Sequence, residues 1–381
     1  MRGPEKRVSK LHRQPVGSPK YLKTLLPAIR AQVNAEQCRA FLGYVHEELG
    51  RLSQRPESYA IHSPDKLIDV VAEFSRTPDL SREKAIAIVS SVAGATSLNS
   101  AVTAQVSHCV SAELALKIWA NLHVQFPRQS PVPMFTPVET VIPWTDNTTF
   151  QSLVRSQFEA RRGRPVTDLS RVDPRFSMDL FVKAYEYRVS WTSNLADHLK
   201  INPESPQLIM VYEHKICLWN HLKMAQDKNS VTVLPVPLIE EAIDTLNLLF
   251  PFGKKSTKSF LRRHGKTFHG LGKCGRATQY DLREYHYWRK EIGDLAEVLS
   301  QRPRGKAQFI LNRDGTNTLE LWTFWTAIAF GILAMIGVVT GVYSAAYAKK
   351  AFDVEMLQYQ LALAQACSAL NATDLLPGFC H

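Results

Sequence analysis

The amino-acid sequence predicts an all-α protein: an irregular multi-helix domain followed by one C-terminal transmembrane helix. Three observations support this fold class. Apolar residues recur at helical spacing along much of the chain. No segment has a strand pattern long enough to argue for a sheet. One long run near the C-terminus contains no charged residue and is typical of a membrane span.

Composition supports a folded chain with a basic surface. The 381 residues are 45% hydrophobic and 9% aromatic, which is enough to build a core. A net charge of +11 favours acidic partners such as anionic lipid, RNA or an acidic protein. The six cysteines form no C-x-x-C pair, which argues against a zinc ribbon and a disulfide-dense secreted module. They are Cys38, Cys109, Cys217, Cys274, Cys367 and Cys380.

Changes in composition along the chain indicate six segments. The first is basic and has no apolar run of the length that a signal peptide needs. The expected segments are a basic flexible arm (1–30), an N-terminal helical region (31–126), a Pro-rich loop (127–147), a second helical region (148–316), a transmembrane helix (319–348) and a short tail (349–381).

Helix signals dominate the N-terminal region. Ser63 as a cap and Pro64 at the first helical position predict a helix over 64–75. Ser81 begins another helix. Apolar residues that step by four predict a long packed helix over 97–124. We expect that helix to be central to the core.

Prolines interrupt the chain before the second helical region. The five prolines between Pro127 and Trp144 exclude a helix and suggest a boundary between two helical halves. Helix restarts at about Thr148. Further helical runs are predicted over 178–199, 206–226, 237–249 and 278–300. The nearest candidate for a strand is SVTVLPV at 230–236, which its own proline weakens.

The predicted transmembrane helix is the most specific signal in the chain. Residues 321–348 carry no charge, and a helix of this length extends about 42 Å, more than the roughly 30 Å of bilayer hydrocarbon. Trp322 and Trp325 at one end and Tyr343 and Tyr347 at the other fall where aromatic rings prefer the headgroups.

A face of small residues lies within this predicted span. Gly337 and Gly341 form a G-x-x-x-G motif, and Ala345 continues it. Small side chains let two membrane helices approach closely, so this face is a candidate helix–helix contact for a homodimer.

Flanking charges predict the orientation. The N-terminal flank carries Arg302, Arg304, Lys306 and Arg313, whereas the tail after Lys350 has no Lys or Arg. The positive-inside rule therefore predicts a single-pass protein with its large N-terminal domain in the cytosol. The sequence does not indicate which membrane it spans.

Two N-x-T sequons offer markers of this orientation. They are Asn147 and Asn371, and the predicted topology makes Asn371 the glycosylation candidate. Cys367 and Cys380 lie in the same tail, where they would either pair in an oxidising compartment or remain unpaired.

One segment of the second helical region is strongly basic. Its cations are Lys254, Lys255, Lys258, Arg262, Arg263, Lys266, Lys273 and Arg276, with no acidic residue between them. These charges are those of a solvated surface, an anionic-lipid patch or an RNA-binding patch. Among the binding alternatives lipid is preferred, because the anchor brings the segment near a bilayer and no RNA-binding motif surrounds it.

His214, Cys217 and His221 have the spacing of one helix face. Imidazole and thiolate are ligands for zinc or copper, and Met210 and Met224 flank the set. The same stretch is apolar nearly all round, however, so these side chains are predicted to be packing groups. No metal and no cofactor is predicted.

The common catalytic motifs are missing from the sequence. Gly265-Lys266-Thr267 imitates the end of a Walker A loop, but Phe260 occupies the position of its first glycine. Neither H-E-x-x-H nor G-x-S-x-G occurs. The prediction is a protein that is not an enzyme, and the alternative is an enzyme whose site is assembled between helices.

Several segments resemble a large set of single-pass membrane proteins of filamentous fungi. They are RVSWTSNLADHL, YEHKICLWNH, LIEEAIDTLNLLFPFG, RRHGKTFHGLGKCGR, YDLREYHYWRKEIGDLAEVLSQRPRG and LELWTFWTAIAFGIL. The resemblance covers about 145–350. Some members are similar to the product of the subtelomeric hrmA-associated cluster of Aspergillus. The resemblance implies a membrane-anchored interaction or regulatory protein that affects hyphal surface or biofilm properties. It implies an unknown protein partner and supplies no catalytic residues to carry over.

Overall fold

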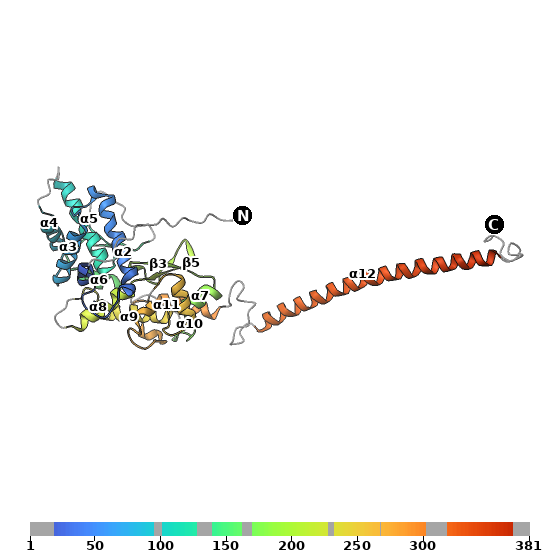
Figure 1. The fold of residues 1–381 in the computed structure, drawn as a ribbon. Coiled ribbons are helices and arrows are strands. Elements are labelled where there is room, and N and C mark those ends of the chain that lie inside the picture. The colour runs from blue at the N-terminus through green and yellow to red at the C-terminus, as the bar shows by residue number, and fades with distance from the viewer. Residues whose placement is uncertain are drawn as a thin grey trace. The chain divides into compact units, whose positions relative to one another are not determined.

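The computed structural model describes residues 19–94, 101–127, 139–161, 170–227, 232–266, 268–301 and 318–368 (Figure 1). The chain forms two compact units, Met1–Ala307 and Gln308–His381. The first is a folded domain with one extensive hydrophobic core, and the second is built on a single long helix. Helices dominate both units, which confirms the predicted fold class.

The N-terminal part of the domain is helical. Its elements are α1 (Pro19–Leu25), α2 (Ala35–Gln54), the short 3₁₀ helix η1 (Pro56–Ser58), α3 (Pro64–Arg76), α4 (Arg82–Ala93) and α5 (Ala101–Ala120). The predicted starts of α3 and α4 are confirmed, and the Ser81 side chain accepts a hydrogen bond from the Lys84 amide at the start of α4. The predicted flexible arm is too long, because Pro19 begins a helix and Leu25, Leu26 and Ile29 are buried.

Helix α5 is central to the core, as its spacing predicts. Val110, Leu114, Ile118 and the following Leu122 are all buried. Burial of each such side chain contributes about 1.5–3 kcal/mol. The helix ends at Ala120, because the positive φ of 51° at the next residue, Asn121, breaks the helical backbone.

The rest of the domain mixes helices with short strands. The elements are β1 (Val124–Gln125), β2 (Ile142–Pro143), α6 (Phe150–Glu159), α7 (Met178–Ala184), β3 (Arg188–Thr192), η2 (Leu195–Asp197), β4 (Ile201–Asn202), β5 (Ser205–Tyr212), α8 (Lys215–Gln226), α9 (Val236–Leu249), α10 (Lys255–Arg263), η3 (Phe268–Leu271), η4 (Leu282–Glu284) and α11 (Arg289–Ser300). The predicted helices at α6, α9 and α11 are confirmed in type, although residues before Arg289 are not α-helical.

A three-stranded sheet is the main departure from the prediction. Its order is β3-β5-β4, with β3 parallel and β4 antiparallel to β5. The predicted helices over 178–199 and 206–226 are therefore wrong beyond α7 and before α8. The last four residues of β5 are all buried, so the polar–apolar alternation of a half-exposed strand is missing. The strand candidate at 230–236 is not confirmed in its described part, because residues 232–235 are not in a strand and Val236 begins α9.

The two predicted helical halves form one compact unit. Residues far apart in sequence are hydrogen-bonded, since the Ala28 amide donates to Asn220 Oδ1 at 3.0 Å. Helix α2 packs against both α5 and α8. Strand β2 lies within the predicted Pro-rich loop and pairs in parallel with β1. The loop is therefore an internal connection and not a domain boundary.

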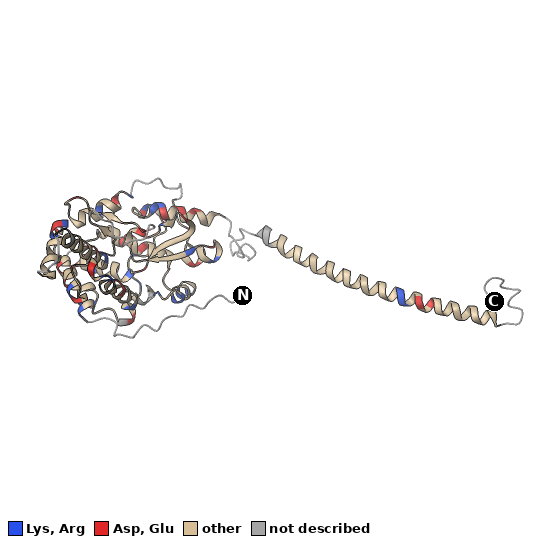
Figure 2. Cartoon of the chain, turned by 90° about the horizontal axis from the view of Figure 1, so that it is seen from above, with Lys and Arg blue, Asp and Glu red and all other residues tan. Residues whose placement is uncertain are grey.

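The second unit consists of α12 (Thr318–Cys367), a helix of 50 residues that extends about 75 Å. The segment Trp322–Cys367 contains a stretch of 18 residues with a mean hydropathy of 2.0. It is long and apolar enough to cross a membrane. Charged residues colour only its later part in Figure 2, where Lys349 and Lys350 lie. The helix does not stop at 348 as predicted, and it is longer than the roughly 40–45 Å of a whole bilayer.

Candidate functional site

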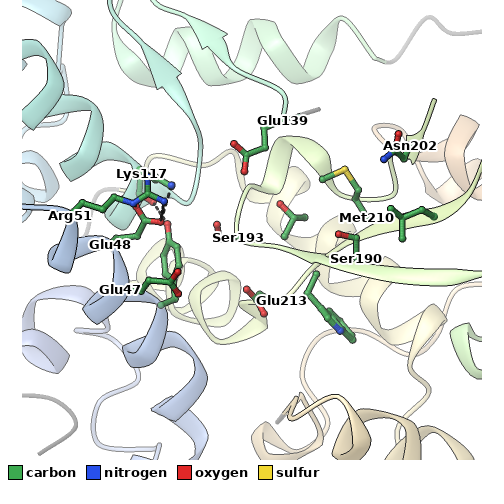
Figure 3. Close-up of a pocket in the computed structure, with 14 residues that line it drawn as sticks. Glu47, Glu48, Arg51, Lys117, Glu139, Ser190, Ser193, Asn202, Met210 and Glu213 are labelled. Carbon is green, nitrogen blue, oxygen red and sulfur yellow. Dashed lines mark hydrogen bonds and ion pairs between the residues drawn. The ribbon is translucent and has the colours of Figure 1, made fainter. Parts of the chain in front are cut away.

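A polar cleft in the domain has a volume of about 390 Å³. It lies between α2, the C-terminal part of α5 and the sheet. Its lining residues are Tyr44, Glu47, Glu48, Arg51, Lys117, Glu139, Ser190, Trp191, Thr192, Ser193, Asn202, Leu208, Met210 and Glu213. Figure 3 shows a charged cluster at one end, Asn202 and Met210 at the other, and Glu139 and Glu213 on either side between them. This volume is typical of small-molecule sites.

The charged cluster at one end is almost fully buried. Lys117 Nζ lies 2.9 Å from Glu48 Oε1, and both side chains are about 5% exposed or less. Arg51 Nε approaches Glu48 Oε2 at 2.9 Å from the more exposed side. Burial lowers the pKa of Lys117, and the adjacent Glu48 carboxylate opposes that shift. Two cations thus contact one buried carboxylate at the end of the cleft.

The carboxylate of Glu213 lies on a side wall at the end of β5. Lys266 forms an ion pair with it and also lies over the Trp191 ring, 5.0 Å from the centroid. Facing it, Glu139 Oε2 lies 3.6 Å from Nδ1 of the buried His123. Because Glu48 and Glu213 are each paired with a lysine, neither is a free general base. The arrangement is suited to binding a polar ligand.

A buried polar network supports the cleft from behind. Asn194 Nδ2 donates to Asp197 Oδ2 at 2.8 Å and to the Thr140 carbonyl at 2.8 Å. The Thr140 amide donates back to Asp197 Oδ1 at 2.9 Å. These bonds fix the segment before β2 to the turn after β3. They hold Glu139, the neighbour of Thr140, at the cleft wall.

His198 continues this network into the core. Its Nδ1 accepts a hydrogen bond from the Tyr212 amide at 3.2 Å, so the neutral ring carries its proton on Nε2. That nitrogen lies 2.7 Å from Thr245 Oγ1, which donates to the Ala242 carbonyl. Burial lowers the pKa of His198 to about 3, so the ring is neutral and structural.

The three candidate metal ligands are buried but do not form a metal site. His214 precedes α8, and Cys217 and His221 lie within it. His214 packs on Tyr44 with a ring-centroid separation of 4.7 Å and on Phe41 at 5.5 Å. Among the described residues, no group of three or more His, Cys, Asp or Glu side chains is placed to hold a metal ion. Met210 lies on β5, so it does not share a helix with the others.

The structure divides the basic segment into two classes. Lys266 and Arg276 are structural: Lys266 pairs with Glu213, and Arg276 Nη2 lies 2.6 Å from the buried carboxylate of Asp244. The others are exposed, namely Lys254, Lys255, Lys258, Arg262, Arg263 and Lys273. No ion pair joins these six to any acidic residue in the part of the chain that the structure describes.

The remaining sequence candidates concern the second unit and the sequons. Gly337 and Gly341 have no neighbouring atom within 4 Å of an added Cβ, and Ala345 is exposed on the same helix. Asn147 is exposed in the folded domain. Cys367 is disulfide-bonded. Outside the described residues lie Asn371, Cys380, Arg302, Arg304, Lys306 and Arg313.

The cleft was not predicted from the sequence. Glu48 and Lys117 are 69 positions apart, and Glu139 belongs to a segment that was predicted to be a plain loop. One signal was present, because Lys117 lies in a helix that was predicted to be central to the core. A buried lysine needs a carboxylate partner.

Comparisons with protein-family models, curated proteins and solved structures give no match to this chain.

Proposed function

We propose that the chain is a single-pass membrane protein whose helical domain is a binding or regulatory module and not an enzyme. The observation that carries the proposal is α12, a helix with apolar side chains on all sides. None of the residues in its most apolar stretch is buried. A helix that is apolar all round needs an apolar environment, and a bilayer supplies it.

In this proposal the large domain faces the cytosol. Arg302, Arg304, Lys306 and Arg313 precede the span, and no Lys or Arg follows Lys350 in the sequence. The disulfide at Cys367 supports the same orientation, because disulfides persist in oxidising compartments. The four described cysteines of the domain are buried thiols, which agrees with a reducing side.

The polar cleft is the part of the domain best suited to receive a ligand of the module. It combines a volume of about 390 Å³ with ion pairs and hydroxyl groups whose positions are fixed by the surrounding network. Preorganised polar groups in a concave site favour binding because little ordering is needed when the ligand arrives. From the fungal resemblance, we propose that this binding affects the hyphal surface or biofilm.

Topology tests the proposal. The full-length protein is expressed in eukaryotic cells and compared with Asn371→Gln and Asn147→Gln variants by glycosidase-sensitive mobility. We expect a shift that is lost only in Asn371→Gln. Asn147 is exposed on the folded domain, so it would be accessible if that domain were translocated. Loss of the shift only in Asn147→Gln would overturn the proposed orientation.

A further inference from the structure

Helix α10 carries its cations on one side. Lys255, Lys258, Arg262 and Arg263 are exposed, and we call these four residues the basic face. The residues of the opposite side, Thr257, Phe260 and Leu261, are buried. At about 100° per residue the four cations fall within an arc centred opposite the buried side. The packing of α10 in the domain therefore turns these charges to solvent.

The basic face is not neutralised by its own domain. None of its four side chains is ion-paired with an acidic residue in the described ranges, in contrast to the nearby Lys266 and Arg276. The two structural pairs show that cations of this segment take carboxylate partners where the fold needs them. The basic face is therefore available to an external anion.

An exposed apolar side chain lies close to these charges in the sequence. Phe252 precedes α10 and is 54% exposed, although most large apolar side chains of the domain are buried. Gly253 separates it from Lys254 with a φ of +87°, a turn that a side chain would strain. Cations beside an exposed aromatic ring are typical of peripheral membrane surfaces, where the ring enters the headgroup region.

We propose that the basic face and Phe252 dock on the anionic surface of the membrane that α12 spans. This inference rests on the proposed function, because it needs the anchor. Only 17 residues separate Ser300 at the end of α11 from Thr318 at the start of α12. Such a connection spans at most about 60 Å. The domain is thus confined near a bilayer, and a high effective concentration makes a weak surface attraction sufficient.

Charge complementarity sets the expected strength. Each basic residue near an anionic leaflet strengthens binding about fivefold, so four together give about 600-fold. The attraction is screened as the ionic strength rises. Docking would fix which side of the domain faces the membrane and would leave the opposite side for cytosolic partners.

The test uses the full-length protein in nanodiscs of phosphatidylcholine alone or with phosphatidylserine. A polarity-sensitive fluorophore is attached at Ser256→Cys, an exposed position of α10, and in a second sample at Ser91→Cys, an exposed position of α4. Labelling is selective because the described thiols of the domain are buried. We expect a blue-shifted emission at position 256 in anionic discs only, reversed by high salt, and no shift at position 91.

Charge reversal provides the matched comparison. Lys255→Glu, Lys258→Glu and Arg262→Glu together remove the attraction of three charges, and we expect at least a 100-fold weaker docking and loss of the blue shift. The control changes net charge equally with Lys66→Glu, Lys84→Glu and Arg155→Glu, which are exposed cations of other helices without an ion pair to any described residue. We expect this variant to keep the shift. An equal loss in both variants would overturn the assignment to the basic face.

Two other outcomes would also overturn the proposal. A shift of equal size in neutral and anionic discs would exclude charge-driven docking. A shift produced by added RNA in neutral discs, and not by anionic lipid, would assign the basic face to nucleic acid. Neither outcome would overturn the membrane span of α12, because glycosylation mapping tests the span and does not depend on docking of the domain.

Discussion

The buried ion pair of the cleft allows a quantitative test of the domain structure. Lys117→Met removes the ammonium that lies 2.9 Å from Glu48, with both side chains about 5% exposed or less. Removing one partner of a buried pair costs about 3–5 kcal/mol, because the other charge stays buried and uncompensated. Arg51 still contacts Glu48 Oε2 at 2.9 Å, so we expect about 3 kcal/mol, the low end of that range.

A double variant separates the pair from the packing. Glu48→Gln together with Lys117→Met leaves no uncompensated charge at the site, and Arg51 is exposed enough to be solvated. We expect the double variant to recover most of the loss and to remain within about 1.5 kcal/mol of the parent. The exposed pair of Arg76 and Glu73 is the control. Its N–O distance is 2.6 Å, yet Arg76→Met is expected to cost at most about 1 kcal/mol.

The assay is urea unfolding at neutral pH, followed by tryptophan fluorescence, on a fragment ending at Ala307, where the first compact unit ends. The three variants and the parent are compared at equal m-value. A cost below about 1 kcal/mol for Lys117→Met, or an equal cost for the single and double variants, would refute a buried ion pair at this place.

Three further predictions concern pH and packing in the same fragment. Burial lowers the pKa values of His198 to about 3 and of His214 and His221 to about 4. The unfolded pKa is about 6.5, so unfolding takes up protons, and the stability that is present above pH 6.5 is lost as the pH falls through the folded pKa values. When the loss is complete, His214 and His221 each contribute about 3 kcal/mol and His198 about 5 kcal/mol. A free energy of unfolding that stays flat between pH 6.5 and 4.5 would contradict this. Arg276→Met leaves the buried Asp244 carboxylate unpaired and is expected to cost about 3 kcal/mol at neutral pH, and a cost below 1 kcal/mol would count against the pair. Gly275→Ala adds a Cβ 2.7 Å from Ile243 Cγ2 at a φ of +84° and is expected to cost about 2–4 kcal/mol; Gly253→Ala, at a similar φ in open space, is expected to cost about 1 kcal/mol, and equal melting shifts would refute the contact.

Local signals in the sequence predict the helices but not the sheet. Ser81 is a cap in the structure as expected, and the four-residue steps of α5 are buried as expected, because both signals depend on neighbours along the chain. Strands β3 and β5 pair residues about 20 positions apart, such as Trp191 with Val211. Their apolar residues also match helical spacing, and tertiary pairing decides between the two periods.

The cleft was unpredictable for a similar reason. Its buried pair joins α2 to α5, and Glu139 reaches the wall only because Asn194 and Asp197 hold the adjacent Thr140. These contacts are long-range, and no spacing rule encodes them. The basic segment was visible in sequence, but only the fold distinguishes Arg276, which pairs with a buried acid, from the exposed basic face of α10.

Extraction of the full-length protein from membranes by alkaline carbonate tests the central claim most directly. This treatment releases proteins held by surface charge and leaves those whose helices span the bilayer. We expect the full-length chain in the membrane pellet and a chain ending at Ala307 in the supernatant, because only the former contains α12. Recovery of the full-length chain in the supernatant would show that α12 does not span a membrane and would contradict the account.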